Sequence, residues 1–330
     1  MRKQQRALVI GGAGMLGREI ALQLQEQGSD VTIFDLEPVD INGIESHVGD
    51  IRDRDSVEKI VAGKDVVFQT AAAVWDVRLP ESVYLEVNVD GNKNVIEACV
   101  SQGIPKLVYT STLDVVVDGR KPITYGDESL PYPKKLPKDP YSRTKIIAEK
   151  MVLEANSAKL LTCALRPVGM YGPRDKYHLA NIITMAKKGM RIRLGNGSAR
   201  FSHVYSENAA HAHLLAAEHL VPGSKVCGNA YFVCDHQPAS NLFDFMEPFL
   251  EALGLSAPDK KIPYWLAYIL AGIVELLPVT ANFNRFAVVQ TCVDHTFVSD
   301  KAEADFGYTP IVSKEEAFAR TLKWFQANST

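Results

Sequence analysis

A short apolar run, ALVIGG, leads directly into three glycines, Gly11, Gly14 and Gly17, spaced three residues apart. The run predicts a buried β-strand, and the apolar periodicity of residues 15–27, stopped by Gly28, predicts a helix after it. Glycines in such a turn let the backbone come close to a pyrophosphate, which binds the N–H groups at the start of the helix. This unit constrains the fold strongly, because it predicts a dinucleotide-binding βαβ arrangement. A flavodoxin-like turn without a nucleotide is the less favoured interpretation.

Strand and helix patterns then alternate through the first half of the chain. The strand candidates are DVTIFD (30–35), DVVFQTAA (65–72), KLVYTST (106–112) and LTCALRP (161–167). Strands rich in Val, Ile and Leu between helices predict a parallel sheet covered on both faces. The fold class expected is α/β, a Rossmann-type doubly wound sheet with a smaller, mostly helical C-terminal substrate lobe.

The change in pattern near residue 170 predicts how the chain divides. We expect residues 1–170 to form the nucleotide-binding domain, with about 200–235 returning to it. We expect 171–330 to supply a discontinuous substrate-binding lobe. Ser313 and Glu316, ahead of an apolar periodicity, predict a capped helix near the end.

Two carboxylates bear on the cofactor. Asp35 ends the second predicted strand, where a carboxylate accepts hydrogen bonds from the adenosine ribose and repels a 2′-phosphate. No Arg or Lys follows it in FDLEP, so the sequence favours NAD over NADP. Asp50, in GDIRD, follows the third strand, where it would meet the adenine amino group. The alternative is a helix N-cap, a role that Asp53 could equally serve.

Composition argues against several classes of partner. The 330 residues carry a formal net charge of -3 and have no basic run with interleaved aromatics, so we expect no nucleic acid partner. Five scattered cysteines without a C-x-x-C pair indicate reduced thiols and a cytoplasmic setting. His203, His211, His213 and His219 lack a completing ligand set, so we expect core or helix-surface residues and no metal.

The most apolar segment is IPYWLAYILAGIVELLP, residues 262–278. Prolines bound it, Glu275 interrupts it, and it is shorter than the ~20 residues that a membrane span requires. The pattern favours a buried or pocket-lining helix over an interfacial anchor. Trp265, Tyr268 and Ile269 supply apolar surface that suits a hydrophobic ligand.

Hydroxyl groups end the fifth predicted strand, in VYTST, and YSRTK follows a helix and loop later. Tyr141 and Lys145 stand four residues apart, on a segment that looks helical from Ile146 onward. The carboxyl ends of parallel strands face the cofactor crevice. A hydroxyl there can meet a tyrosine and a lysine that project from the next helix.

This combination resembles the extended short-chain dehydrogenase/reductase family over nearly the whole chain. The motifs that carry the resemblance are GGAGMLG, Asp35, GDIRD, VNVDGNKNV, VYTST, YSRTK and LRPVGMYGP, in family order. The chain looks most like the 3β-hydroxysteroid dehydrogenase branch, which includes sterol 4α-carboxylate 3-dehydrogenases. The narrower match lies in ITYGDESLPYP, FSHVYSENAAHAHLLAA and FGYTPIVSKEEAFARTLKWF.

The resemblance implies a role for each matched residue. Tyr141 is the general acid/base, although a phenol with a pKa near ~10 is a poor base at neutral pH. Lys145 and the NAD⁺ charge favour the phenolate, and Lys145 also binds the nicotinamide ribose. Thr112 takes the place of the usual catalytic Ser, with Ser111 as the alternative if the register differs by one. Ile10 replaces a Thr that often opens the glycine motif, so a turn-stabilising hydrogen bond is in doubt.

The resemblance further implies contacts to the cofactor. Pro167 and Val168 lie where family backbone groups hold the carboxamide, and Asn88 lies where an Asn supports the cofactor-side network. The expected cofactor-binding residues are Gly11, Gly14, Met15, Leu16, Gly17, Asp35, Asp50, Ile51, Ala71, Ala72, Asn88, Tyr141, Lys145, Pro167 and Val168.

The expected function is NAD-dependent oxidation or reduction of a secondary alcohol on a steroid, a sterol or a long-chain hydroxy acid. Oxidation at C3 of a 4α-carboxysterol gives a β-keto acid, which loses CO₂ readily. The alternatives are a nucleotide-sugar epimerase, a reductase of 2-alkyl-3-oxo acids, and a non-catalytic NAD-sensing protein. TLD at Thr112–Asp114 lacks the acidic pair of a dehydratase. The resemblance also implies a homodimer and peripheral membrane contact through 262–278.

Overall fold

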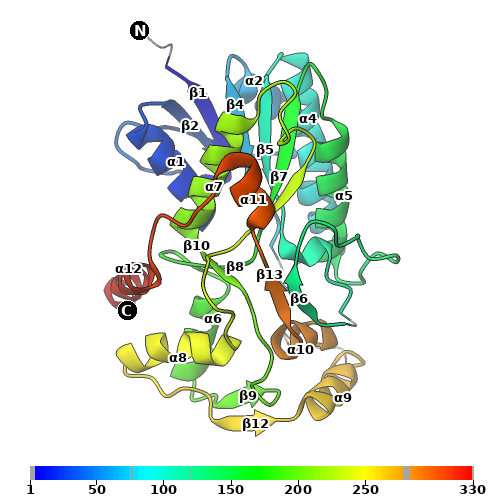
Figure 1. The fold of residues 1–330 in the computed structure, drawn as a ribbon, viewed down its shortest axis with the longest axis vertical. Coiled ribbons are helices and arrows are strands. Elements are labelled where there is room, and N and C mark those ends of the chain that lie inside the picture. The colour runs from blue at the N-terminus through cyan, green and yellow to red at the C-terminus, as the bar shows by residue number, and fades with distance from the viewer. Residues whose placement is uncertain (1–3, 75, 77, 120, 278–282, 329–330) are drawn as a thin grey trace.

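A parallel sheet forms the centre of the molecule. The computed structural model describes residues 4–74, 76, 78–119, 121–277 and 283–328. Within these ranges seven strands pair in parallel in the order β11-β7-β5-β4-β1-β2-β3 (Figure 1). Their bounds are β1 Arg6–Ile10, β2 Asp30–Asp35, β3 Glu45–Val48, β4 Val66–Gln69, β5 Lys106–Thr110, β7 Leu161–Pro167 and β11 Ala230–Val233. The order reverses between β1 and β4, where sheets of this kind bind ligands outside the carboxyl ends of the strands.

Helices cover both faces of this sheet. On one face lie α1 Met15–Glu26, α7 Ser206–His219 and α11 Asp300–Phe306, and on the other lie α2 Arg54–Val61, α4 Asn92–Ser101 and α5 Pro140–Glu154 (Figure 1). Successive strand residues alternate between the two cores, so Val9 packs into the first while Leu8 and Ile10 pack into the second. The predicted doubly wound α/β fold is confirmed.

Strand ends decide where the site residues lie. β2 and β7 have the predicted bounds, whereas β4 and β5 end at Gln69 and Thr110, earlier than predicted. Thr112 therefore lies in the loop after β5, where its side chain caps the 3₁₀ helix η2 (Leu113–Val115).

Helix α5 begins at Pro140 rather than near Ile146. The carboxylate of Asp139 accepts a hydrogen bond from the backbone N–H of Ser142 at 2.7 Å, and a proline occupies the first turn, as helix starts favour. Both Tyr141 and Lys145 therefore lie on the helix. A short helix α3 (Glu81–Tyr84) and a π-helix η1 (Leu85–Gly91) run into α4, and the sequence pattern did not indicate the π-helical turn.

The C-terminal lobe lies beyond the carboxyl edge of the sheet, in the lower half of Figure 1. Its helices are α6 Leu179–Lys187, α8 Leu242–Ala252, α9 Tyr264–Val274, α10 Arg285–Cys292 and α12 Lys314–Ala327. Two parallel strand pairs lie between the lobe and the sheet: β6 Ile123–Gly126 with β13 His295–Phe297, and β8 Gly169–Tyr171 with β10 His203–Tyr205. A third pair, β9 Ile192–Leu194 with β12 Lys260–Ile262, lies at the far end of the lobe (Figure 1). Ser313 caps α12 through the N–H of Glu316. One apolar cluster joins α6, α8 and α12, and another joins α9 and α10.

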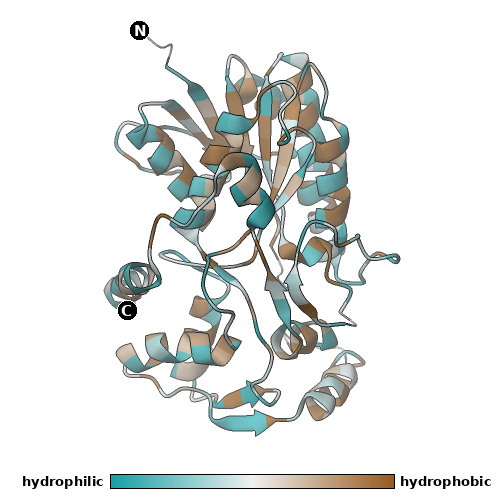
Figure 2. Ribbon diagram, viewed as in Figure 1, coloured by the Kyte–Doolittle hydropathy of each residue, from teal (hydrophilic) through white to brown (hydrophobic). Residues whose placement is uncertain are grey.

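Helix α9 exposes most of its apolar side chains. Trp265, Ile269 and Ile273 are 63%, 53% and 51% exposed, while Ala267 and Ala271 are buried. The expectation of a buried helix is therefore wrong, because Ala267 and Ala271 are the only buried residues of α9. The expectation that the segment lines a pocket stays a prediction. Figure 2 shows α9 at the lower right edge of the molecule, coloured mostly from white to brown.

Two further observations concern the apolar segment at residues 262–278. Residue 278, at the end of the predicted segment, lies outside the described residues. Among the helices of the described ranges, none is long and apolar enough to cross a bilayer.

Candidate active site

The glycine turn after β1 is tightly packed against its neighbours. Gly11 has φ +88°, and a Cβ atom there would lie 2.6 Å from the backbone N of Ala71. A Cβ atom on Gly17 would lie 2.2 Å from the carbonyl oxygen of Gly11. The hydroxyl of Thr70 donates to the carbonyl of Ile10 at 2.8 Å, so another residue supports the turn that lacks the usual threonine.

The start of α1 suits a pyrophosphate. The helix begins at Met15 and Leu16 without a side-chain cap, and its first turn has no acidic residue among these described positions. Its first N–H groups and the positive end of its dipole are therefore available to an anion. A hollow of about 300 Å³ lies beside the turn, lined by Ala13, Glu37 and Arg18 among others. These features fit a dinucleotide cofactor.

Asp35 holds the backbone where the adenosine ribose is expected. One carboxylate oxygen accepts from the N–H of Ala13 at 2.9 Å and the other from the N–H of Glu37 at 3.1 Å. Each oxygen keeps a second lone pair for a ribose hydroxyl. The negative charge at this edge disfavours a 2′-phosphate.

Asp50 is engaged by a neighbouring arginine. Its carboxylate lies 2.6 Å from a guanidinium nitrogen of Arg52, which also pairs with Glu86 at 3.0 Å. The Arg52 hydrogen bonds hold the pKa of Asp50 below its usual value. Asp53 caps α2 by accepting from the N–H groups at the helix start, so the capping role considered for Asp50 belongs to Asp53.

Asn88 ties the loop after β4 to helix α5. Its side-chain oxygen accepts from the N–H of Ala73 at 2.8 Å, and its amide group donates to the hydroxyl of Thr144 at 3.0 Å. The residue is fully buried on η1. It fixes the loop that contains Ala71 and Ala72 against the helix that carries Tyr141. Ile51 is buried beneath Gly91 of the same π-helix.

Thr112 and Tyr141 lie on neighbouring elements, because α5 packs against η2, the 3₁₀ helix that Thr112 caps after β5. Burial raises the pKa of Tyr141 far above its ordinary value, Asp114 raises it further, and a hydrogen bond with Thr112 lowers it. Ser111 is buried and its hydroxyl has no hydrogen-bond partner among the described residues, whereas the Thr112 hydroxyl donates to a carboxylate oxygen of Asp114 at 2.9 Å. The assignment of Thr112 as the hydroxyl that meets Tyr141 stays a prediction.

Lys145 is bound to the strand rather than to Tyr141. Its ammonium donates to the hydroxyl of Tyr109 and to the carbonyl of Thr110, both at 2.6 Å. Burial lowers the pKa of Lys145 to about 7, and the Glu149 carboxylate opposes that shift. Glu149 is itself paired with Arg166 at 2.7 Å, both nearly inaccessible to solvent.

Pro167 and Val168 end β7 beside β11. The N–H of Val168 donates to the carbonyl of Val233 at 3.2 Å, and Pro167 has no N–H to donate. A carboxamide here would therefore find carbonyl acceptors, because the pairing of β7 with β11 uses the Val168 amide.

Two residues in this site were not among the expected ones. Asp114 is partly buried and accepts from the hydroxyl of Thr112 at 2.9 Å and from the side-chain amide of Gln290 at 2.5 Å. Gln290 lies on α10 in the C-terminal lobe. Asp114 was visible in sequence two residues after Thr112, but no local pattern points to Gln290.

The clustered histidines have structural roles. His213 accepts from or donates to the hydroxyl of Thr110 at 2.9 Å and bonds the carbonyl of Ala209 at 2.7 Å. Burial lowers the pKa of His213 to about 4, so the ring is neutral near pH 7. His203 is partly buried and stacks on Phe245, with the ring centroids 3.8 Å apart. No set of three metal-ligating side chains occurs within the ranges that the structure describes.

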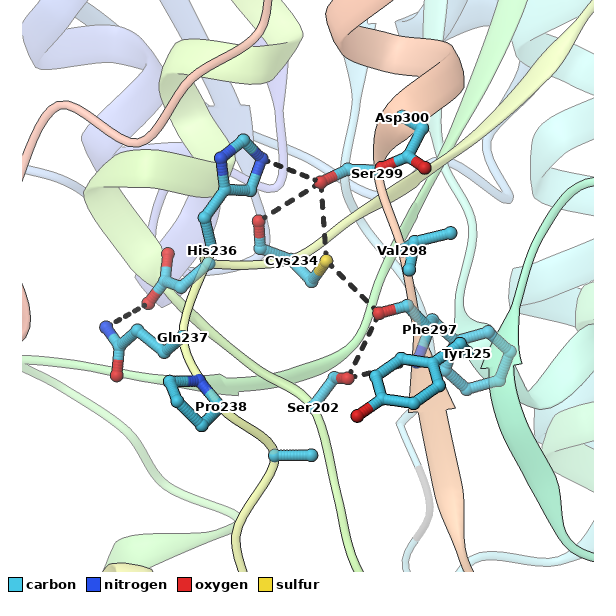
Figure 3. Close-up of a pocket in the computed structure, with 12 residues that line it drawn as sticks. Tyr125, Ser202, Cys234, His236, Gln237, Pro238, Phe297, Val298, Ser299 and Asp300 are labelled. Atoms are coloured by element: carbon cyan, nitrogen blue, oxygen red, sulfur yellow. Dashed lines mark hydrogen bonds between the residues drawn. The ribbon is translucent and has the colours of Figure 1, made fainter.

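A separate hollow of about 230 Å³ opens between the carboxyl end of β11 and the pair β6–β13 (Figure 3). Figure 3 shows Tyr125 over Phe297 on one side and His236 bonded to Ser299 at 3.3 Å on the other. Its lining does not include Tyr141 or Thr112. The reacting groups expected from sequence therefore lie outside this hollow.

Comparison with known proteins gives one family and close relatives. A model described as "3-beta hydroxysteroid dehydrogenase/isomerase family" matches residues 8–264. A Danio rerio protein, short-chain dehydrogenase/reductase family 42E member 1, is 38% identical over 99% of this chain and 89% of its own length. The Mus musculus sterol-4-alpha-carboxylate 3-dehydrogenase, decarboxylating, is 36% identical over 98% and 91%. The Stenotrophomonas maltophilia 2-alkyl-3-oxoalkanoate reductase is 36% identical over 95% and 97%.

Solved structures match the fold at lower identity. An epimerase from Methanothermobacter thermautotrophicus superposes with a TM-score of 0.79 at 22% identity, covering 99% of this chain and 94% of that one. A dTDP-glucose 4,6-dehydratase from Streptomyces venezuelae, solved with NAD, gives 0.77 at 22%, covering 98% of each chain. At this identity the likeness concerns the fold alone.

Proposed function

Because the chain belongs to the 3-beta hydroxysteroid dehydrogenase/isomerase family, we propose that it oxidises or reduces a secondary alcohol on a steroid- or sterol-like substrate. At the coarser level it is an NAD-dependent oxidoreductase that acts on CH–OH groups, as its dehydrogenase and reductase relatives indicate. The substrate class and the roles of individual residues are the parts proposed here.

The observation that carries the proposal is the packing of α5, which has Tyr141 in its first turn, against η2, the 3₁₀ helix that Thr112 caps after β5. Tyr141 takes the proton from the substrate hydroxyl in oxidation and returns it to the carbonyl oxygen in reduction. Thr112 hydrogen-bonds the same oxygen and orients it. Burial alone makes the Tyr141 phenolate unfavourable, so a cation must stabilise it.

Lys145 is the cation nearest in the chain to this task. Its ammonium bonds the Tyr109 hydroxyl and the Thr110 carbonyl, one helical turn from Tyr141. We propose that it also reaches the nicotinamide ribose when the cofactor is bound. The buried Glu149 carboxylate favours the charged form of Lys145 and so preserves its effect on Tyr141.

The glycine turn and Asp35 support NAD as the cofactor. When bound, NAD supplies the hydride acceptor for the alcohol carbon. The N–H groups at the start of α1 hold its pyrophosphate, and Asp35 accepts from its ribose hydroxyls. Asn88 keeps the loop after β4 in place beside it. Asp50, Ile51, Pro167 and Val168 complete the proposed contacts, the last through its carbonyl group.

A hydrophobic substrate is supported by the relatives and by the lobe. The mouse relative is named for a sterol 4α-carboxylate, and α9 presents Trp265, Tyr268 and Ile269 on the lobe surface. With such a substrate, oxidation at C3 produces a β-keto acid. Loss of CO₂ from it needs no further catalytic group, because the new carbonyl accepts the electron pair of the breaking bond.

Reduction of a 2-alkyl-3-oxo acid is the second candidate, because the Stenotrophomonas reductase matches over 97% of its length. Both reactions interconvert a β-hydroxy acid and a β-keto acid, so the same catalytic groups suit either substrate. A nucleotide-sugar epimerase is the third candidate and is supported by the common fold alone.

The deciding experiment is NADH formation by purified protein with four alcohols: a 3β-hydroxysteroid, a 4α-carboxysterol, a 2-alkyl-3-hydroxy acid and UDP-galactose. We expect turnover with a sterol or steroid. Product analysis for CO₂ separates a decarboxylating reaction from simple oxidation. No NADH from the first three, together with tightly held NAD and interconversion of UDP-sugars, would replace the proposal by the epimerase.

The Tyr141→Phe variant tests the mechanism. We expect kcat to fall by about 10² to 10⁴, the usual contribution of a general acid/base, while NAD affinity is unchanged. Ser142→Ala in the same turn is not a suitable control, since Ser142 binds the α5 cap, so exposed Tyr125→Phe serves instead. Equal turnover of Tyr141→Phe and wild type would refute the assignment.

We also propose that the exposed face of α9 rests on a membrane surface, since Trp265, Ile269 and Ile273 point out of the lobe. Co-sedimentation with phosphatidylcholine vesicles measures this.

A homodimer is proposed on the family resemblance alone, and sedimentation equilibrium measures it.

A further inference from the structure

Lys145 is the one cation among the proposed catalytic residues, and two neutral groups of β5 hold it. Its ammonium donates to the hydroxyl of Tyr109 and to the backbone carbonyl of Thr110, both at 2.6 Å. The same nitrogen lies 4.3 Å from the centre of the Tyr109 ring. Both side chains are buried, with Tyr109 0% and Lys145 2% exposed. Water therefore does not compete for this contact.

Tyr109 joins β5 to α5 through an apolar ring and a polar tip. The ring packs in the core layer that also contains Ala148 and Val152 of α5. The hydroxyl at the end of the ring accepts the hydrogen bond from Lys145, as a buried tyrosine needs a partner for its polar atom. A phenylalanine would fill the same layer but would offer no acceptor. The hydroxyl of Tyr109 thus serves Lys145 rather than the packing.

The carboxylate one helical turn further along α5 is engaged elsewhere. Glu149 pairs with Arg166 of β7 at 2.7 Å and accepts from the hydroxyl of Tyr132 at 2.6 Å. Burial lowers the pKa of Lys145 to about 7, and Glu149 opposes that shift from a distance. The groups that touch the ammonium directly are neutral, so they hold it without cancelling its charge. The charge of Lys145 therefore stays available to Tyr141 and to the cofactor.

The two contacts also set the direction of the ammonium. A lysine ammonium has three N–H bonds in a tetrahedral arrangement. Tyr109 and Thr110 take two of them, so the direction of the third is fixed. Without the Tyr109 hydroxyl, one fixed bond would remain and the group would rotate about it. A contact with a ribose hydroxyl requires the fixed direction.

We propose that Tyr109 is a positioning residue for the reaction: its hydroxyl holds the Lys145 ammonium in the charged form and directs the remaining N–H group towards the nicotinamide ribose. Tyr109 acts through Lys145, so this inference rests on the role proposed for Lys145. It adds a residue of β5 to a pair that the sequence places on one helix.

The test uses protein labelled with ¹³C at the ε carbon of lysine, followed by NMR from mildly acidic to alkaline pH without substrate or cofactor. The Lys145 signal is identified by its loss in Lys145→Met. In Tyr109→Phe, which keeps the ring, we expect the Lys145 midpoint to fall by about half a pH unit to one unit. The reason is that a hydrogen bond from the ammonium is roughly twice as strong as one that involves the neutral amine.

Tyr308→Phe is the matched control, because it removes the hydroxyl of another tyrosine that is 0% exposed. That hydroxyl donates to the carbonyl of Cys234 at 3.3 Å and not to Lys145. We expect the Lys145 midpoint to stay at the wild-type value. An unchanged midpoint in Tyr109→Phe overturns the proposal, and so does an equal fall in Tyr308→Phe, which would indicate a packing effect.

If Tyr109→Phe does not fold, the wild type decides with ¹³C at the ζ carbon of tyrosine. The Tyr141 signal is identified by its loss in Tyr141→Phe. A second tyrosine signal should move at the Lys145 midpoint, and that movement should be absent from Lys145→Met. The lack of any such second signal overturns the proposal.

Binding of NAD separates this inference from the proposed function. At mildly acidic pH Lys145 is charged in both wild type and Tyr109→Phe, so isothermal titration reports the direction of the ammonium. We expect NAD to bind Tyr109→Phe about threefold to tenfold more weakly than wild type, and Lys145→Met at least as weakly. Wild-type affinity in Tyr109→Phe alone refutes the directing role. Wild-type affinity in Lys145→Met removes the ribose contact from the proposed function and the directing role with it.

Discussion

The central sheet and helix α9 place their apolar side chains in opposite surroundings. Val66, Val67 and Phe68 of β4 are completely buried between two layers of helices, whereas Trp265 and Ile269 of α9 are more than half exposed. Burial of such side chains stabilises the fold by about 1.5–3 kcal/mol each. The sheet residues therefore stabilise the chain itself, and the outer face of α9 contributes little to folding and is open to a ligand or a surface.

Two ion pairs differ in burial in the same way as the sheet and α9. Glu149 and Arg166 pair beneath the active-site helix, with side chains 0% and 6% exposed. Glu316 and Arg320 pair on α12 with about half of each side chain in solvent. The first pair fixes the helix that carries Tyr141 and Lys145, whereas the second lies on the surface of the lobe.

Glu149→Gln should have the largest effect on stability. It leaves the Arg166 charge buried without its counter-ion, and breaking such a pair costs about 3–5 kcal/mol. Urea unfolding measures the free energy of unfolding. The matched change Glu316→Gln in the exposed pair should cost at most about 1 kcal/mol. Equal losses in the two variants would mean that burial does not distinguish these regions.

The next largest loss of stability is expected when the pH is lowered, through a buried histidine. The pKa of His213 is about 4 in the folded protein and near ~6.5 unfolded, so the unfolded chain binds a proton that the folded one refuses. Stability from this group is complete above pH ~6.5 and is lost as pH falls towards about 4, by about 2 kcal/mol at pH 5. His213→Gln should flatten the stability profile between these values. Exposed His219→Gln should leave the profile unchanged, and a flattening there would contradict the assignment to burial.

Asp35→Asn separates the cofactor region from the substrate region. Loss of the charge removes a strong acceptor for the ribose and the repulsion of a 2′-phosphate, so NAD should bind about tenfold more weakly, a loss on the order of 1.4 kcal/mol. The preference for NAD over NADP should shrink as well, and KM for the alcohol should not change. Isothermal titration with each cofactor measures this, with Asp259→Asn, an exposed carboxylate of the C-terminal lobe, as the control. Unchanged NAD affinity in Asp35→Asn would remove Asp35 from the cofactor site.

How much of the structure the sequence could predict depends on how far apart in the chain the interacting residues lie. β2 and β7 are read directly because strands buried on both faces are continuous apolar runs. Tyr141 and Lys145 are placed by a spacing within one helix. The Asp114–Gln290 contact joins residues 176 positions apart, and nothing local to either one indicates it.

The misread helix has a different cause. The apolar composition of α9 indicates that its side chains favour contact with other apolar groups. It does not indicate whether the lobe or another surface provides that contact. The interior of the lobe accepts Ala267 and Ala271, which are small, and leaves the large side chains outside. Lys145 is a similar case, since its spacing from Tyr141 is local but its bond to Tyr109 depends on how α5 packs on β5.

The smallest stability effect is expected on α9. Ile269→Ser should change the free energy of unfolding by no more than about 0.5 kcal/mol, because the side chain is 53% exposed and lies outside the core. The same substitution at Ile33 of β2, which is 0% exposed, removes a buried side chain and leaves a cavity, so it should cost about 3 kcal/mol or more. Binding to vesicles should respond in the reverse order, falling for Ile269→Ser and not for Ile33→Ser while that variant is folded. A large loss of stability in Ile269→Ser would place α9 in a packed interface and remove the contrast between the two regions.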